Sequence, residues 1–185
     1  METYLLSDNR FKEKLKFAAK FIMESGETFD EIILYTDDDL HVDFDNESYN
    51  VVLKQHKDIE FEHDVSKKKL IIWHDIDYLS DEKRKIFHMS LSRCRMYTQI
   101  ILCCNSLRDV HQTVHHLTWY YVMAQCNSRN RDVIRKKIWT KDTKKIHRVM
   151  RECMEGEDNY CIVSAKTPFC NESIRKNFGE YIKME

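Results

Sequence analysis

Two short apolar runs, each followed by polar residues, constrain the fold of this sequence most strongly. They are residues 70–73, followed by His74, Asp75 and Asp77, and residues 99–104, followed by Asn105. A segment with helical spacing separates the two runs, which is typical of buried parallel strands. The polar residues then lie at the carboxyl ends of the strands, where α/β sheets place their chemistry.

The rest of the chain alternates between helix-like and strand-like patterns. We expect helices at residues 11–24, 46–57, 80–91, 109–116, 130–137 and 142–153, and further strands at residues 31–36, 118–124 and 159–164. This alternation predicts βαβ units. The expected fold class is α/β, a three-layer sandwich with a mostly parallel central sheet, ending in a polar tail at residues 171–185.

Composition fits one globular domain over residues 1–185, with 42% hydrophobic residues, only 3 Gly and 1 Pro. So few turn-forming residues argue against a sandwich or barrel full of tight turns and against a disordered or linker-rich chain. We expect no signal peptide and no membrane span, because no apolar run is long enough. The 7 Cys are odd in number and contain no CxxC pair, which predicts reduced thiols in a cytosolic or nuclear protein that is not secreted.

Charge is unevenly distributed along the chain. Residues 24–64 contain 14 acidic side chains and 2 lysines, whereas residues 129–151 contain 10 Lys and Arg and 2 Asp. The basic helical segment at residues 129–152 has the charge to contact DNA phosphates or an acidic protein surface. The alternative is an ordinary solvated helical face, docked on the acidic half of the chain.

The order of these segments resembles that of the genome-packaging ATPases of large DNA viruses, the poxvirus-type branch of the FtsK/HerA group of P-loop ATPases. The similar segments span almost the whole chain: residues 29–35, 70–76, 92–94, 98–105, 110–116, 119–123, 161–163 and 174–178. The resemblance implies a P-loop ATPase-like core, an oligomeric viral protein, and work on DNA in the cytoplasm or nucleus of an infected host cell.

The resemblance also implies roles for individual residues. His74 takes the place of the family's Mg-binding acid and Asp75 that of the acid that orients water, whereas a shifted register uses Asp75 and Asp77 instead. Arg93 falls at the place of an arginine finger, and Asn105 at that of a polar sensor. The structural alternatives are solvated carboxylates at a strand end, a surface arginine and a cap.

The phosphate-binding loop of the family is degenerate in this chain. The motif G-x-x-x-x-G-K-[ST] requires glycines whose backbone N–H groups cradle phosphates. Residues 6–13 take its place without any glycine, and Lys12 is the cofactor-binding residue that keeps its register. Asp8 and Glu13 bring negative charge to the same loop. ATP and Mg²⁺ are therefore cofactors only if the degenerate site still binds them.

Three function classes remain open from the sequence. The first is a packaging-ATPase-like viral protein that has lost most of its nucleotide chemistry; the second is a clamp-loader-like AAA+ subunit, which residues 100–106 resemble; the third is a non-enzymatic α/β interaction protein. The histidines and cysteines lack zinc-finger spacing, so no metal site is predicted. A Cys–His nucleophile stays open, because such partners meet only in space.

Overall fold

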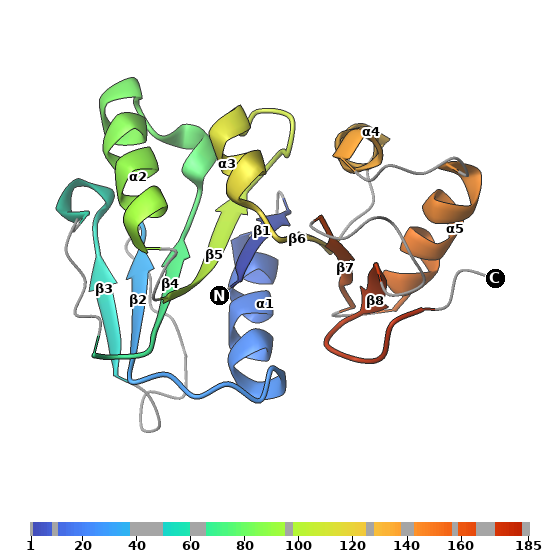
Figure 1. Cartoon of the computed structure of the whole chain (residues 1–185), viewed down its shortest axis with the longest axis horizontal. Coiled ribbons are helices and arrows are strands. Elements are labelled where there is room, and N and C mark those ends of the chain that lie inside the picture. Colours follow the sequence, from blue (N-terminus) through green and yellow to red (C-terminus); the bar gives the residue numbers. More distant parts are fainter. Residues whose placement is uncertain are drawn as a thin grey trace.

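The computed structural model describes residues 2–8, 11–37, 50–59, 66–94, 98–124, 128–137, 143–156, 159–165 and 173–182. Eight strands form one sheet in the order β3-β2-β4-β5-β1-β6-β7-β8 (Figure 1). The strands are β1 (Thr3–Ser7), β2 (Glu31–Tyr35), β3 (Val51–Lys54), β4 (Lys69–Trp73), β5 (Thr98–Cys104), β6 (Tyr120–Met123), β7 (Cys161–Ser164) and β8 (Ile174–Lys176). Strands β3 to β6 in this order are parallel, and β7 and β8 pair antiparallel.

Helices cover both faces of the sheet, which confirms the expected three-layer α/β fold. They are α1 (Phe11–Glu24), α2 (Asp81–Cys94), α3 (Gln112–Leu117), α4 (Ser128–Lys137) and α5 (Thr143–Cys153), with 3₁₀ turns η1 (His56–Asp58) and η2 (Ile76–Tyr78). Phe17 and Phe21 of α1 pack on one face. Phe87 of α2, Val114 of α3 and Ile146 of α5 belong to the core on the other face.

The register of the central strands aligns their carboxyl ends at one edge of the sheet. Trp73 of β4 pairs with Tyr35 of β2 on one side and with Leu102 of β5 on the other. The Trp73 ring stacks on Tyr35 at 5.5 Å and meets Phe87 of α2 edge-on at 5.2 Å, so the end of β4 is held from both the sheet and a helix. The polar residues after β2, β4, β5 and β1 consequently share one edge.

Three local expectations from the sequence are wrong. Residues 51–54, expected within a helix, form edge strand β3, where Val51 and Val52 pair with Ile32 and Ile33 of β2; residues 46–49 lie outside the described part. β-Branched side chains favour a strand when a parallel neighbour is available. Strand β1 was not predicted, yet it lies between β5 and β6. The polar tail contains β8.

No helix in the described part of the chain is both long and apolar enough to cross a membrane.

Candidate functional site

The acids after β4 and the asparagine after β5 lie together at the carboxyl edge of the sheet. Strand β4 ends at Trp73, so Asp75 and Asp77 follow it in a turn. Asp75 has a left-handed backbone with φ 52°, unusual for a residue with a side chain. The Asn105 backbone N–H donates to Asp77 Oδ2 at 2.9 Å, and the Asn105 amide donates to Asp77 Oδ1 at 3.3 Å. The turn thus places both carboxylates beside Asn105.

Lys14 of α1 completes this group, and the sequence analysis missed it. Its side chain is 1% exposed. The Lys14 ammonium forms an ion pair with Asp75 Oδ1 and donates to Asn105 Oδ1 at 2.9 Å. A signal was present in the sequence, because Lys14 shares helical spacing with Phe17 and Phe21 on the buried face of α1.

The described residues of the phosphate-loop position belong largely to a strand and a helix. Residues 6 and 7, which we placed in the loop, belong to β1, where Leu6 and Ser7 pair with Cys103 and Cys104. Helix α1 begins at Phe11, so three residues connect it to β1. In the order strand, GxxxxGK[ST], helix, counting from the end of β1 puts the motif's lysine at Lys14. Lys12 lies in the first turn of α1, and its side chain is outside the described part.

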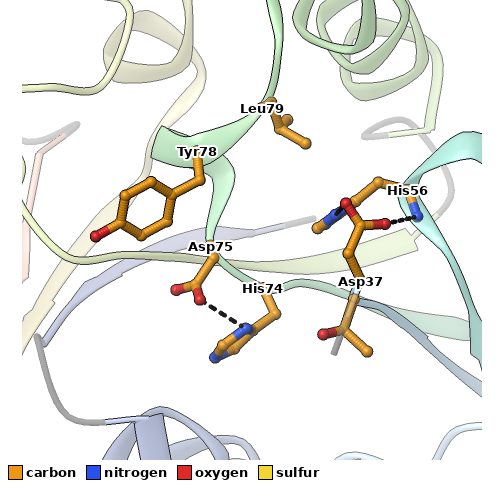
Figure 2. Close-up of a pocket in the computed structure, with 7 residues that line it drawn as sticks. Asp37, His56, His74, Asp75, Tyr78 and Leu79 are labelled. Carbon is orange, nitrogen blue, oxygen red and sulfur yellow. Dashed lines mark hydrogen bonds and ion pairs between the residues drawn. The ribbon is translucent and has the colours of Figure 1, made fainter. Parts of the chain in front are cut away.

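A cavity of about 130 Å³ adjoins Asp75 on the side of β2 and β3 (Figure 2). Its lining residues come from the ends of β2, β3 and β4: Thr36, Asp37, His56, His74, Asp75, Tyr78 and Leu79. Two histidine–carboxylate pairs face it. His56 Nδ1 lies 3.2 Å from Asp37 Oδ2, and His74 Nδ1 lies 3.3 Å from Asp75 Oδ2. His56 is 4% exposed, and its Nε2 has no hydrogen-bond partner among the described residues.

Asp37 is held ionised by its neighbours. Burial opposes its charge, but hydrogen bonds from Lys83 and from His56 outweigh burial, so the pKa of Asp37 lies below its ordinary value of 3.8. Lys83 Nζ is 3.0 Å from Asp37 Oδ2, and the His56 backbone N–H donates to Asp37 Oδ1 at 3.1 Å. Both oxygens of this carboxylate therefore already accept hydrogen bonds.

The structure does not bring Arg93 to the acids of the same chain. Helix α2 carries the chain from the end of β4 back to the start of β5, so Arg93, in its last turn, lies near the opposite edge of the sheet (Figure 1). Its side chain is exposed. A role in a neighbouring subunit stays a prediction.

The buried cysteines near the acids are unsuited to nucleophilic chemistry. Burial raises the pKa of Cys103 to about 12, and burial also raises the pKa of Cys104 well above its ordinary value. Both thiols are fully buried and stay protonated at neutral pH. Within the described ranges, no group of three or more His, Cys, Asp or Glu side chains is arranged to hold a metal ion.

Comparison with known proteins gives structural likenesses, whereas no family model and no curated protein matches the sequence. The DNA-packaging ATPase B204 from Sulfolobus turreted icosahedral virus is 11% identical, with a TM-score of 0.56 and 95% of each chain covered. The genome packaging NTPase B204 from Sulfolobus turreted icosahedral virus 2, in complex with AMPPCP, is 10% identical, with a TM-score of 0.58, covering 95% of this chain and 96% of that chain. Its sulfate complex is 12% identical, with a TM-score of 0.56 and coverage of 98% and 97%. The sheet and these likenesses together show that the chain has the P-loop NTPase-like fold of viral packaging ATPases.

Proposed function

We propose that the chain is a packaging-ATPase-like viral protein whose nucleotide site is degenerate, and that it acts in genome packaging or as an oligomeric accessory to it. It would work in the cytoplasm or nucleus of an infected host cell. The likeness to packaging proteins supports a role in genome packaging. The residues at the sheet edge support the loss of nucleotide chemistry. ATP and Mg²⁺ belong to this function only if the degenerate site still binds them.

The position of Lys14 is the observation that best supports a degenerate nucleotide site. In a phosphate loop, backbone N–H groups of a glycine-rich turn and a lysine ammonium face the phosphates. Here α1 begins at the fourth position of the motif, counted from the end of β1, and the two glycine positions hold Asp8 and Glu13. The ammonium of Lys14 is already engaged by Asp75 and Asn105. Phosphates would have to displace these contacts without glycine N–H groups to compensate.

Nucleotide titration tests this part of the proposal. The full chain with Mg²⁺ is titrated with ATP by calorimetry, and phosphate release is followed in parallel. We expect no binding at micromolar ATP and no hydrolysis above background, because Asp8 and Glu13 take the two glycine positions of the motif. Micromolar binding that is abolished by Lys12→Ala or Lys14→Ala would contradict the degenerate site.

Helices α4 and α5 provide a surface with the charge to meet DNA. Their apolar sides pack in the core through Ile134, Ile146 and Met150. Their other sides expose basic residues, namely Arg129, Lys136, Lys144, Arg148 and Arg151. The two helices lie beyond β6, at the opposite end of the molecule from β3 (Figure 1). This arrangement supports the proposal that the basic segment contacts the phosphate backbone.

Salt-dependent binding tests the DNA contact. Anisotropy of a labelled 30-base-pair duplex is measured with the full chain over a range of salt concentrations. The logarithm of the binding constant should fall with the logarithm of salt, by a slope of about 0.9 for each phosphate contacted. Lys144→Glu with Arg148→Glu should weaken binding at least about tenfold and reduce the slope, because each change removes a phosphate contact.

The matched control changes two exposed lysines on the other half of the molecule, Lys57→Glu with Lys85→Glu. This control has the same change in net charge and should bind the duplex like wild type at physiological salt, where distant charges are screened. Equal loss in both double variants would show that net charge, rather than α4 and α5, determines binding. No DNA binding, together with a salt-insensitive protein partner, would favour the third class, an α/β interaction protein.

A further inference from the structure

Two buried cysteines lie next to each other where helix α5 packs on strand β7. Cys153 is the last residue of α5, on the inner side of the helix that Ile146 and Met150 also form, and it is 1% exposed. Cys161 is the first residue of β7 and is fully buried. Side chains alternate along a strand, and Cys161 is on the side of β7 that shares a core with α5. The fold therefore directs both thiols into one layer.

The two thiols are within hydrogen-bond reach of each other. A hydrogen bond from Cys161 is the largest influence on Cys153, and it holds the pKa of Cys153 below its ordinary value of 9.0. Burial and Glu152 oppose this effect, whereas the positive charge of Lys176 adds to it. Lys176 belongs to β8 and pairs with Cys161 in the sheet. Cys153 is consequently suited to become a thiolate, the form of cysteine that attacks a disulfide.

The connection from α5 to β7 is anchored at both of its ends. Gly156 turns the chain with a φ of 100°, and the Asn159 amide donates to the Glu155 carbonyl oxygen. The Tyr160 backbone N–H donates to Asn177 Oδ1 at 2.8 Å. These contacts fix the residues that flank the two cysteines. A disulfide then needs the sulfur atoms to approach from hydrogen-bond distance to about 2.05 Å.

We propose that Cys153 and Cys161 form a redox site, at which a small disulfide of the glutathione class closes a reversible bond between α5 and β7. The bond would fasten to the sheet the helix whose outer side carries Lys144, Arg148 and Arg151. Inside cells a disulfide of this kind is transient and follows the redox state of the compartment. The inference is independent of the nucleotide site and goes beyond the proposed function.

The reaction is a thiol–disulfide exchange in two steps. Cys153 gives up its proton, and its sulfur attacks one sulfur of the small disulfide; that S–S bond breaks, and the first small thiolate leaves and takes up the proton. Cys161 then loses its proton and attacks the Cys153 sulfur, which releases the second small thiolate to take up that proton. The protein loses two electrons and two protons, and the small disulfide gains them as two thiols.

Oxidation of the full chain tests the site. The reduced chain is equilibrated with oxidised glutathione at mildly alkaline pH, the remaining thiols are blocked with N-ethylmaleimide, and the protein is digested with trypsin. Cleavage after Arg151 and Lys166 gives the peptide 152–166, which contains these two cysteines and no other. We expect this peptide to carry no maleimide and to be about 2 Da lighter than the reduced peptide, because two hydrogens are lost. Dithiothreitol before blocking should restore both maleimide sites.

Thermal unfolding compares the oxidised chain with two variants. Oxidised wild type should melt at least about 4 °C above reduced wild type, since a cross-link restricts the unfolded chain. Cys153→Ala should abolish this rise and leave Cys161 open to maleimide. Cys103→Ala is the matched control, because it removes a buried thiol from the core on the other face of the sheet. Its rise on oxidation should equal that of wild type.

The outcomes that would overturn the inference are equally direct. They are a peptide 152–166 that keeps two maleimides, one that carries glutathione without the internal bond, and one that is linked to a cysteine elsewhere. A rise in melting temperature that survives Cys153→Ala would also overturn it. If Cys153→Ala does not fold, the wild-type peptide still decides, because its mass is read without any variant. DNA and nucleotide binding are separate measurements, so the proposed function is judged independently.

Discussion

The carboxyl edge of the sheet differs on the two sides of Asp75. On the side of β1 and β5, which we call the lysine side, Asp75, Asp77 and Asn105 enclose the buried ammonium of Lys14. On the side of β2 and β3, which we call the histidine side, His56 and Asp37 border an open cavity (Figure 2). Both sides have carboxylates at strand ends, yet the lysine side is filled by the Lys14 ammonium and the histidine side borders an open cavity.

The difference shows that the burial of the cation, rather than the number of acids, determines how much a strand-end ion pair contributes to stability. Lys14 is 1% exposed, so its attraction to Asp75 acts with little solvent screening. Lys83 and Asp37 are 35% and 50% exposed, and an ion pair of that kind contributes little. The lysine side should therefore be a stability element, and the histidine side a region that tolerates change.

Lys14→Met should have the largest effect. It removes the charge that compensates Asp75 and leaves the side-chain oxygen of Asn105 without the Lys14 donor, so we expect a loss of about 3 kcal/mol in unfolding free energy. Urea unfolding at pH 7 without metal measures it. Lys20→Met, which removes a partly exposed i,i+4 pair with Glu24 and a contact with the Tyr160 ring, should change stability by less than about 1 kcal/mol. A loss below about 1 kcal/mol for Lys14→Met would remove the distinction between the two sides.

Asn130→Ala should follow in size, because Asn130 holds the lysine side from α4. Its amide donates to Ser7 Oγ at the end of β1 at 2.6 Å, and its carbonyl accepts from the Leu107 backbone N–H at 3.1 Å. At 2% exposure, its loss leaves buried polar groups unpaired, at a cost of about 2 kcal/mol. Lys136→Ala, on the exposed side of the same helix, is the control for urea unfolding. Equal stability of both variants would contradict this role of Asn130.

The strand ends were predicted, whereas the cation was missed although its helical spacing was a signal. Strands β4 and β5 are apolar runs on both faces, so their polar successors, Asp75, Asp77 and Asn105, had to share an edge. Lys14 was missed because a lysine on an amphipathic helix is ordinarily placed on the solvated side, and its partners are distant in sequence. The short strand β1, without β-branched residues in its centre, also gave no local signal, although its end determines the register of α1.

The sequence-based prediction of the histidine side failed for a different reason. His56 was placed on a helix at residues 46–57, whereas it follows edge strand β3. Residues 51–54, which include two valines, form a strand because they pair with β2. The local spacing of apolar residues carries no information about this pairing. Asp37 was correctly placed just after a strand, but its pairing with His56 depends on that ladder, since β3 brings the turn alongside. Sequence periodicity therefore located Asp37 and not its imidazole partner, His56.

Asp37→Asn should have the smallest effect, and its pH dependence separates it from a packing defect. The pKa of Asp37 is lowered in the folded chain, so its contribution is complete above the ordinary value of 3.8 and is lost as pH falls through the folded pKa. Because the pair is so exposed, the unfolding free energy of wild type should exceed that of Asp37→Asn by less than about 1 kcal/mol at pH 6. Urea unfolding from pH 6 into the acid range should show this difference shrinking as pH falls below 3.8, because the unfolded chain then binds the proton before the folded chain does. Asp81→Asn, which removes an exposed pair with Arg84 at 3.3 Å, is the matched control. A loss as large as that of Lys14→Met, or one that does not shrink as pH falls below 3.8, would mean that the histidine side is closed as tightly as the lysine side.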